Sequence, residues 1–401
     1  MIRRVLFVIN TLGQAGAEVA LAELLKRLND PDLEISLFVL LGQGELIKKI
    51  PPFVRLLNKR YSSQSVLSKQ GGRELKKTVL RTAFHHASLL RLLPYLFSNA
   101  TDMVRKKRFQ ADKLLWRLVS DGAERFDEEY DLAVSFLEGG SAYYVADHVK
   151  AKHKAAFLHI DYGKAGYTRK LDLDCYLKFD RIFCVSDEVR EHFIRYYPEC
   201  KKRIRIFENF IDPDEIRRKA VLPGGFDDGY DGIRLLTVGN LSYHKGYDLA
   251  VETMALLKKY GCQMRWYVIG EGPERKKLEK MIEKYGLQKD FILLGKRNNP
   301  YPYYVQTDLY IHASRFEGKS IAIREAQVLG CAILASDCSG NREQICNGRD
   351  GILCPPVPQD LASAVMLLAG SRRLREKYAA ASRGKPTGNE ENIRMLYELL
   401  Q

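Results

Sequence analysis

Residues 314–330 read Ser314-Arg-Phe-Glu-Gly-Lys-Ser-Ile-Ala-Ile-Arg-Glu325-Ala-Gln-Val-Leu-Gly330. They follow an apolar run at 308–313 that is typical of a buried strand, and they continue into a helical pattern that begins near Ser320. A strand, a glycine-containing turn and a helix in this order leave backbone N–H groups available at the helix start, where an anion can bind. The segment therefore predicts one unit of a parallel α/β sheet with an anion-binding turn.

Two carboxylates flank this predicted turn. Glu317 lies in the turn itself, and Glu325 follows eight residues later, about two helical turns into the helix. Each carboxylate can accept hydrogen bonds from more than one hydroxyl group. An anion-binding turn between hydroxyl-binding carboxylates suits a nucleotide sugar, although the spacing of the two glutamates is not specific by itself.

The same alternation of strands and helices runs through the chain twice. Strand-like apolar runs occur at 4–9, 33–40, 130–136, 154–159 and 179–185, and again at 233–238, 264–269, 291–294, 308–313, 332–335 and 351–354. A turn-rich run at 223–232 separates the two series. Apolar strands connected by helices predict an α/β protein with two Rossmann-like, doubly wound domains that face each other across a cleft.

The expected domains are 1–212, which carries a basic helical insert at about 55–120, and 213–380. Residues 381–401 are expected to form a C-terminal helix that packs back on the first domain. The chain of 401 residues is long enough for two such cores.

The net charge of +14 is concentrated in the insert. Residues 55–120 hold fifteen Lys and Arg against three Asp and Glu, with clusters at 73–77 and 105–108 interleaved with leucines and aromatic residues. This mixture is typical of a surface that meets anionic lipid headgroups. A solvated helical face and a nucleic-acid contact are the alternatives, and no nucleic-acid partner is expected.

Cysteine usage and hydropathy indicate a cytoplasmic protein. The eight cysteines include no Cys-x-x-Cys pair, so reduced thiols in the core are expected rather than disulfides or metal ligands. The N-terminus lacks the pattern of a secretory signal, and no run approaches the length of roughly 18–20 apolar residues that spans a bilayer. The expected location is cytoplasmic, with peripheral contact at the inner face of the plasma membrane.

Several loops at the predicted strand ends carry candidate residues. Gly13-Gln-Ala-Gly16 follows the first strand, His159 ends a later strand, and Lys245 follows the first strand of the second domain, where a diphosphate needs a cation. Asp172-Leu-Asp174 matches the Asp-x-Asp pattern of metal-dependent sugar transferases. It lies in a polar stretch without a preceding apolar strand, so we expect both carboxylates at the solvated surface.

The chain resembles the family-4 retaining glycosyltransferases, which have the GT-B fold, and among them the bacterial capsule, exopolysaccharide and lipopolysaccharide enzymes. The resemblance is strongest at 232–356. It rests on Val238-Gly-Asn-Leu, Lys245-Gly, Val268-Ile-Gly-Glu-Gly-Pro273, Phe316-Glu-Gly-Lys-Ser-Ile-Ala-Ile-Arg-Glu-Ala326 and Asn347-Gly348, and in the first half on Phe157-Leu-His-Ile-Asp-Tyr162 and Asn209-Phe-Ile-Asp212.

The resemblance implies a role for each matched residue. Glu325 would bind the ribose hydroxyls, Glu317 would meet the transferred sugar and the charge developing at its anomeric carbon, and Lys245 would neutralise the diphosphate. The turn at Gly318, with the backbone N–H groups of Lys319, Ser320 and Ile321, would complete the diphosphate site. His159 would approach the donor from the first domain, and Gly13 and Gly16 would face the same cleft. Such enzymes need no metal and no cofactor, because protein cations and helix starts stabilise the departing diphosphate.

One position departs from the family pattern. Many relatives have an arginine five residues before the lysine, and this chain has Asn240 there. Half of the usual diphosphate clamp is therefore missing. Lys319 and Arg297 are the candidates to replace it, and slower catalysis is the alternative.

The implied function is retaining transfer of a sugar from a nucleotide sugar, with UDP favoured by the resemblance, to a saccharide acceptor that is lipid-linked. The pathway would be bacterial surface polysaccharide synthesis, of a capsule or a lipopolysaccharide. Two alternatives stay open: a nucleotide-sugar epimerase on the same fold, and a non-catalytic protein that binds nucleotide sugars or nucleic acid.

Overall fold

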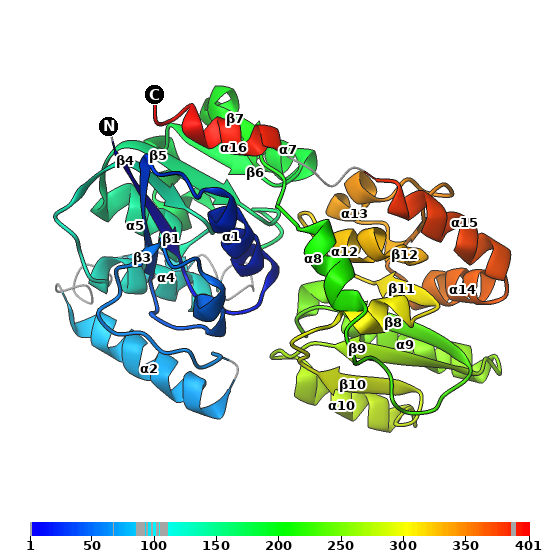
Figure 1. The fold of residues 1–401 in the computed structure, drawn as a ribbon. Helices are drawn as coiled ribbons and strands as arrows, with labels where there is room; N and C mark the ends of the chain where they lie inside the picture. Colours follow the sequence, from blue (N-terminus) through cyan, green and yellow to red (C-terminus); the bar gives the residue numbers. More distant parts are fainter. Residues whose placement is uncertain are drawn as a thin grey trace. The chain divides into compact units, whose positions relative to one another are not determined.

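The computed structural model describes residues 2–66, 68–85, 93, 95–97, 99–101, 104, 111–385 and 390–401. They form two compact units. The N-terminal unit is Met1–Asn209 together with Asn389–Gln401, and the C-terminal unit is Phe210–Gly388. Each unit is a parallel α/β sheet with helical connections (Figure 1).

The sheet of the N-terminal unit runs in the order β3-β2-β1-β4-β5-β6-β7 with every neighbouring pair parallel. Its strands are β1 (Arg3–Ile9), β2 (Leu33–Val39), β3 (Arg55–Leu56), β4 (Glu129–Ser135), β5 (Lys150–Leu158), β6 (Arg181–Cys184) and β7 (Ile204–Ile206). Its helices are α1 (Gly16–Arg27), α2 (Lys69–Phe84), α4 (Ala111–Gly122), α5 (Gly140–His148), α6 (Arg169–Asp172), α7 (Asp187–Tyr196) and α16 (Glu390–Tyr397), with 3-10 turns η1 (Glu45–Lys49), η3 (Cys175–Lys178) and η4 (Pro198–Arg203).

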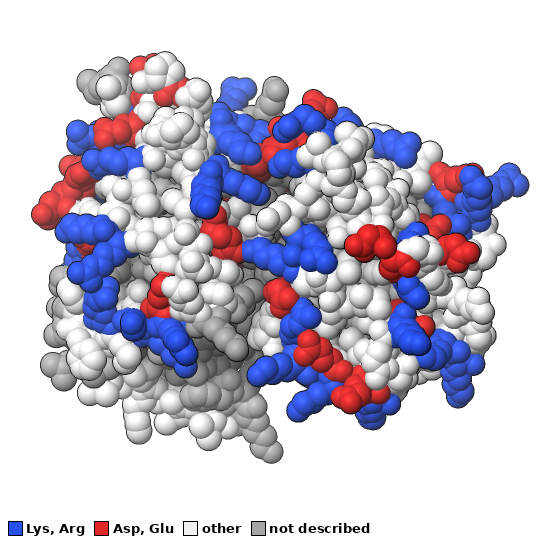
Figure 2. Space-filling view, turned by 60° about the horizontal axis from the view of Figure 1, so that its bottom comes forward, with Lys and Arg blue, Asp and Glu red and all other residues white. Residues whose placement is uncertain are grey.

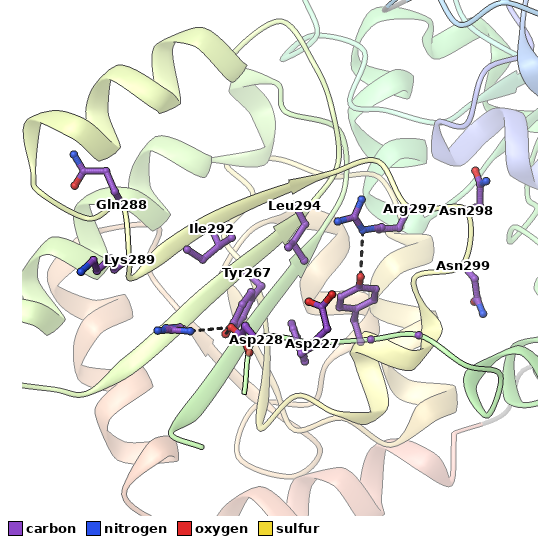
Figure 3. A pocket seen from close by; sticks show the side chains of 15 residues that line it. Asp227, Asp228, Tyr267, Gln288, Lys289, Ile292, Leu294, Arg297, Asn298 and Asn299 are labelled. Carbon is purple, nitrogen blue, oxygen red and sulfur yellow. Dashed lines mark hydrogen bonds and ion pairs between the residues drawn. The ribbon is translucent and has the colours of Figure 1, made fainter. Parts of the chain in front are cut away.

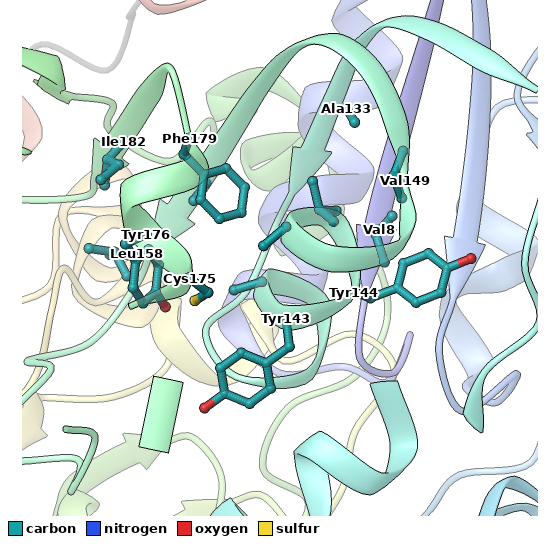
Figure 4. Close-up of a cluster of buried hydrophobic side chains, with 14 of the residues drawn as sticks. Val8, Ala133, Tyr143, Tyr144, Val149, Leu158, Cys175, Tyr176, Phe179 and Ile182 are labelled. Carbon is teal, nitrogen blue, oxygen red and sulfur yellow. The ribbon is translucent and has the colours of Figure 1, made fainter. Parts of the chain in front are cut away.

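The core of this unit is rich in aromatic side chains. Figure 4 shows Tyr143 and Tyr144 of α5 among Val8, Leu158 and Ile182 of the neighbouring strands. Burial of apolar side chains from β1, β4, β5 and β6 on one cluster accounts for the near-continuous apolar runs by which these strands are recognised in the sequence.

The sheet of the C-terminal unit runs in the order β10-β9-β8-β11-β12-β13, again with every pair parallel. Its strands are β8 (Ile233–Val238), β9 (Met264–Ile269), β10 (Phe291–Gly295), β11 (Leu309–His312), β12 (Ile333–Ser336) and β13 (Ile352–Cys354). Its helices are α8 (Pro213–Ala220), η5 (Tyr243–Lys245), α9 (Tyr247–Lys259), α10 (Arg275–Lys284), α11 (Tyr301–Val305), α12 (Ile321–Leu329), α13 (Ser339–Gln344), α14 (Pro358–Ala369) and α15 (Arg372–Arg383).

Both sheets reverse their strand order once. In the N-terminal unit the reversal lies between β1 and β4, and in the C-terminal unit it lies between β8 and β11. Ligands of open α/β sheets bind outside the carboxyl ends of the strands at such a switch point. The topology therefore directs attention to the loops after β8 and β11, and after β1 and β4.

The predicted architecture of two parallel α/β sheets is confirmed. Each predicted apolar run corresponds to a strand, and Ser186 caps α7 by accepting a hydrogen bond from the Val189 N–H at 3.2 Å. The sequence gives no sign of β3 and β7, which are only two and three residues long. It also places the start of β5 four residues late, because the first half of that strand is polar and largely exposed.

The C-terminal segment belongs to the N-terminal unit. Asn392 of α16 donates to the carbonyl of Glu208 at 2.9 Å, and the Tyr397 hydroxyl donates to Asp30 Oδ2 at 2.8 Å. The leucines at 396, 399 and 400 are buried. The chain therefore passes from one unit to the other at residues 209–210 and returns at residues 388–389.

The basic insert contains β3, α2 and α4. Helices α2 and α4 pack through Val79, Ala83 and Leu118. A Cβ on Gly122 would lie 2.0 Å from the Thr82 carbonyl, so this close approach of the two helices requires glycine. The cluster at 105–108 lies outside the described residues. Within the described ranges, no helix is long and apolar enough to cross a membrane.

The expectation that Asp172 is solvated is wrong. Its carboxylate is buried and accepts hydrogen bonds from the hydroxyls of Tyr143 and Tyr162, and its carbonyl accepts from the Arg117 guanidinium. Asp174 is exposed and pairs with Arg169 at 2.6 Å. Because the partners of Asp172 come from α4, α5 and the loop after β5, Asp172 joins these elements in the interior.

Candidate active site

Two loops meet at the switch point of the C-terminal unit. The loop after β8 contains η5 and leads into α9, and the loop after β11 leads into α12. Arg315 joins them: its guanidinium pairs with both carboxylate oxygens of Asp248 at 2.7 and 2.8 Å, and its N–H donates to the His244 carbonyl at 2.7 Å. A guanidinium that pairs with both oxygens of a carboxylate fixes the relative orientation of the two side chains as well as the distance between them.

A glycine allows these two loops to approach each other closely. Gly246 has a φ of +66°, and a Cβ there would lie 2.1 Å from the carbonyl oxygen of Ala313 at the end of β11. Any other residue would push the two loops apart. The Lys-Gly pair of the sequence thus brings Lys245 against the loop that carries Glu317.

Lys245 and Glu317 form a largely buried ion pair. The Lys245 ammonium donates to Glu317 Oε2, and the two side chains are only 17% and 12% exposed. The hydroxyl of Ser314 donates to the same oxygen at 3.2 Å, and Nε2 of His312 lies 3.2 Å from it. Burial alone would raise the pKa of Glu317, but the charge of Lys245 and the hydrogen bond from His312 outweigh it and hold that pKa well below its usual range. Glu317 is therefore a carboxylate at all physiological pH values.

Glu325 lies on α12 and meets α11. Its two carboxylate oxygens accept hydrogen bonds from the hydroxyls of Tyr301 at 3.0 Å and Tyr304 at 3.1 Å. Burial raises the pKa of Tyr304 well above its usual range, so this hydroxyl stays protonated as a donor. The ring of Tyr304 stacks on that of Tyr310 with centroids 5.3 Å apart.

The start of α12 is closed by a reciprocal amide contact. The Ser320 N–H donates to Gln344 Oε1 at 2.7 Å, and Gln344 Nε2 donates to the Ser320 carbonyl at 2.8 Å. A phosphate bound to the Ser320 N–H would have to displace Gln344. Gly318, Lys319 and Ile321 flank this position in the turn and the first turn of α12.

The two candidate replacements for the missing arginine lie in different places. Lys319 is half-buried in the turn before α12, beside Ser320. Arg297 is exposed and its Nε lies 3.2 Å from the Tyr303 hydroxyl, in a cavity of about 930 Å³ that runs along β9 and β10 (Figure 3). Asp227, Asp228, Gln288 and Lys289 also line that cavity. Asn240 is exposed in the loop after β8.

In the N-terminal unit, His159 follows β5 directly and is buried. Its ring lies against Phe136 and Phe157, with centroids 5.1 and 6.0 Å away, and its Nε2 is buried without a hydrogen-bond partner in the described structure. Burial lowers the pKa of His159 to about 4, while a hydrogen bond to the Phe136 backbone opposes that shift. The imidazole is therefore neutral at pH 7.

Sequence reasoning missed Asn10 and Glu138, which join the switch point of this unit. Asn10 Nδ2 donates to the Glu138 carbonyl at 3.1 Å, and the Glu138 carboxylate accepts from the His159 and Ile160 N–H groups. Both side chains are buried. A charged residue that directly follows an apolar run and precedes two glycines is the sequence signal that identifies Glu138.

The Gly13–Gly16 turn is occupied by a carboxylate of the protein itself. Glu18 Oε1 accepts from the Thr11 hydroxyl at 2.6 Å and the Gly13 N–H at 2.8 Å, and its Oε2 accepts from the Ala15 N–H at 2.7 Å. The Glu18 carboxylate thus caps the start of α1 in one direction only, because the Ala15 side chain cannot accept a hydrogen bond in return. The N–H groups of Gly13 and Ala15 thus serve the helix start.

Residues 230–385 match the model of the family described as glycosyl transferases group 1. A Campylobacter jejuni protein named N-acetylgalactosamine-N,N'-diacetylbacillosaminyl-diphospho-undecaprenol 4-alpha-N-acetylgalactosaminyltransferase is 30% identical over 179 residues, 44% of this chain and 47% of that protein. Alpha-D-kanosaminyltransferase of Streptomyces kanamyceticus is 30% identical over 177 residues, 43% of this chain and 45% of that protein. The chain matches about half the length of these curated relatives.

Solved structures match over nearly the whole chain. HepE of Anabaena in complex with UDP-glucose aligns with a TM-score of 0.67 at 15% identity, over 99% of this chain and 100% of that one. The G117R mutant of S. aureus TarM, in complex with Fondaparinux, alpha-GlcNAc-glycerol and UDP, aligns with a TM-score of 0.68 at 13% identity, over all of both chains. These likenesses establish that the fold is GT-B.

Proposed function

Because residues 230–385 match the model of the glycosyl transferases group 1 family, we propose that the chain is a retaining, metal-independent glycosyltransferase that uses a UDP-sugar donor. The acceptor we propose is a lipid-linked saccharide of bacterial surface polysaccharide synthesis, such as a capsule or a lipopolysaccharide. The Campylobacter relative supports this acceptor class, since its name describes transfer to a saccharide on diphospho-undecaprenol.

The observation that carries the proposal is the buried Lys245–Glu317 pair at the switch point of the C-terminal unit. A buried cation beside a helix start suits a diphosphate leaving group, whose charge grows as the bond to the sugar breaks. Glu317 stays ionised, so it can stabilise positive charge at the anomeric carbon and accept hydrogen bonds from sugar hydroxyls. Glu325, held by two tyrosines, is proposed to bind the ribose.

We assign the other candidate residues to donor binding. His159 is neutral, and its unpartnered Nε2 can accept a hydrogen bond from a hydroxyl of the UDP-sugar. Lys319, at the turn before α12, is a better placed replacement for the missing arginine than Arg297, which lines the cavity along β9 and β10. Gly13 and Gly16 are proposed to shape the loop after β1, and Glu18 supports that loop.

Contact with an anionic membrane is supported by the outer face of α2. Arg73, Lys77, Leu80 and Phe84 are exposed at helical spacing along it, and Leu80 and Phe84 expose 60% and 78% of their surface. Cationic and large apolar side chains on one helix face suit a headgroup region. On the molecular face shown in Figure 2, Lys and Arg are interspersed with Asp and Glu, so this face has no continuous basic patch. The proposal of membrane contact therefore rests on the residues of α2 and not on the charge of that face. We propose that the protein works peripherally at the cytoplasmic face of the membrane.

The test is donor turnover with a panel of UDP-sugars, with and without a saccharide acceptor. The Glu317→Gln variant should lower kcat by at least about 100-fold, since it removes charge that matters in the transition state. Glu283→Gln on the exposed face of α10 is the matched control and should keep full activity. An active Glu317→Gln variant would exclude the proposed mechanism.

The same experiment separates the alternatives. An epimerase would convert the donor to an isomeric nucleotide sugar without any acceptor. A binding protein would be stabilised by a donor, by roughly 2.7 kcal/mol at 100 times its Kd, and would show no turnover. A nucleic-acid binder would show affinity that falls steeply with salt.

A further inference from the structure

His312, like His159, is a buried histidine. It is the last residue of β11, at the switch point, and it is only 2% exposed. Its Nε2 lies 3.2 Å from Glu317 Oε2 and 3.0 Å from the Ser314 hydroxyl, and its Nδ1 lies 3.2 Å from the Tyr310 hydroxyl. Both ring nitrogens therefore have partners.

These partners fix which nitrogen carries the proton. Burial lowers the pKa of His312, so the ring is neutral and has a single N–H group. Glu317 is ionised and can only accept, so the N–H must be on Nε2, and Nδ1 then accepts from the Tyr310 hydroxyl. The hydrogen bonds run in one direction, from Tyr310 through His312 to Glu317.

We propose that His312 is a positioning residue that holds the carboxylate of Glu317 in one orientation during sugar transfer, an inference that rests on the proposed function. Lys245, Ser314 and His312 all meet Oε2, so this oxygen is anchored from three sides. When a diphosphate attracts the Lys245 ammonium, the carboxylate loses part of its countercharge in a buried site. A buried carboxylate without donors is costly, and His312 and Ser314 are the neutral donors that remain.

The arrangement also connects the two glutamates of the site. Tyr310 stacks on Tyr304, and the Tyr304 hydroxyl donates to Glu325 Oε2 at 3.1 Å. His312 and the two tyrosines thus lie in one buried row from Glu317 to Glu325. We infer that the row keeps the sugar-binding and ribose-binding carboxylates at a fixed separation.

The test compares His312→Leu with His312→Gln in the full chain. Leucine removes both hydrogen bonds, whereas the glutamine amide can donate to Glu317. We expect kcat for donor turnover to fall by about 100-fold in His312→Leu and to recover at least tenfold in His312→Gln, while the Kd for UDP changes less than about threefold. Thr253→Val, a buried polar-to-apolar change in α9 with no contact to Glu317, is the control for lost packing and should leave kcat unchanged.

The outcomes separate this inference from the proposed function. Equal kcat values for wild type and His312→Leu would overturn the positioning role and leave the transferase activity intact. If wild type turns over no UDP-sugar, the proposed function fails, and crystal structures of both proteins decide the positioning role. An unchanged Glu317 side-chain conformation in His312→Leu would then overturn it, and a rotated carboxylate would support it.

Discussion

Burial sets the chemistry of His159. The unfolded chain takes up a proton on this side chain near its ordinary pKa of 6.5, whereas in the folded chain the pKa is about 4. The folded pKa is depressed, so the stability that the neutral ring contributes is fully present above pH 6.5 and is lost as the pH falls toward 4.

We therefore expect His159→Phe, which cannot be protonated, to be less sensitive to acid. Between pH 7 and pH 5, the unfolding free energy of wild type should fall by about 2 kcal/mol more than that of His159→Phe. Urea unfolding at the two pH values measures this difference. If the unfolding free energy falls equally in both proteins, then His159 takes up its proton as easily in the folded chain as in the unfolded chain.

The limits of sequence reasoning are also clearest for single residues. Glu317 and Lys245 could each be selected from the sequence, but their direct pairing depends on Arg315 and Asp248, which are 67 residues apart and carry no recognisable pattern. Asp172 was misjudged because its partners come from three distant elements. A polar residue's burial depends on long-range packing that a local pattern does not contain.

At the scale of elements, the strands that a single sequence reveals are those that carry a continuous apolar run, the edge strands β10 and β13 included. Strands β1 and β8 were recognised by continuous apolar runs, while β3 and β7 lie at the edge of their sheet and are too short to leave a pattern. The helix start at Ser320 was recognised, but its closure by Gln344 of α13 was not, since it depends on tertiary packing.

Helix α2 carries the prediction at this scale. The double variant Leu80→Ser with Phe84→Ser should bind vesicles of anionic phospholipid at least about tenfold more weakly, because two large apolar side chains no longer enter the headgroup region. Co-sedimentation measures the binding. Val221→Ser removes a similarly exposed apolar side chain from the C-terminal unit and should leave binding unchanged. Equal binding by wild type and the double variant would remove α2 from the membrane contact.

At the scale of the whole molecule, we expect the return of the chain to the N-terminal unit through α16 to stabilise that unit. Deleting residues 390–401 removes the buried leucines at 396, 399 and 400 and the hydrogen bond to Asp30. We expect the N-terminal unit to unfold at least about 3 kcal/mol more easily, from the loss of several buried leucine side chains.

Site-resolved hydrogen exchange measures this effect in each unit separately. Exchange in the C-terminal unit should be unaffected, and Tyr397→Phe, which removes only the hydrogen bond, should have a much smaller effect than the deletion. A deletion that left exchange in the N-terminal unit unchanged would show that α16 adds nothing to its stability.

The two crossings of the chain, at 209–210 and 388–389, make the C-terminal unit an insertion with both of its ends joined to one host. Such a unit can be exchanged as a cassette through two short junctions. Because Lys245, Glu317, His312 and Glu325 all lie inside it, a graft between these junctions would carry these four residues as one set, while His159, Gly13 and Gly16 would stay with the host. Such a graft between related chains would separate the contributions of the two units to donor binding without redesigning either sheet.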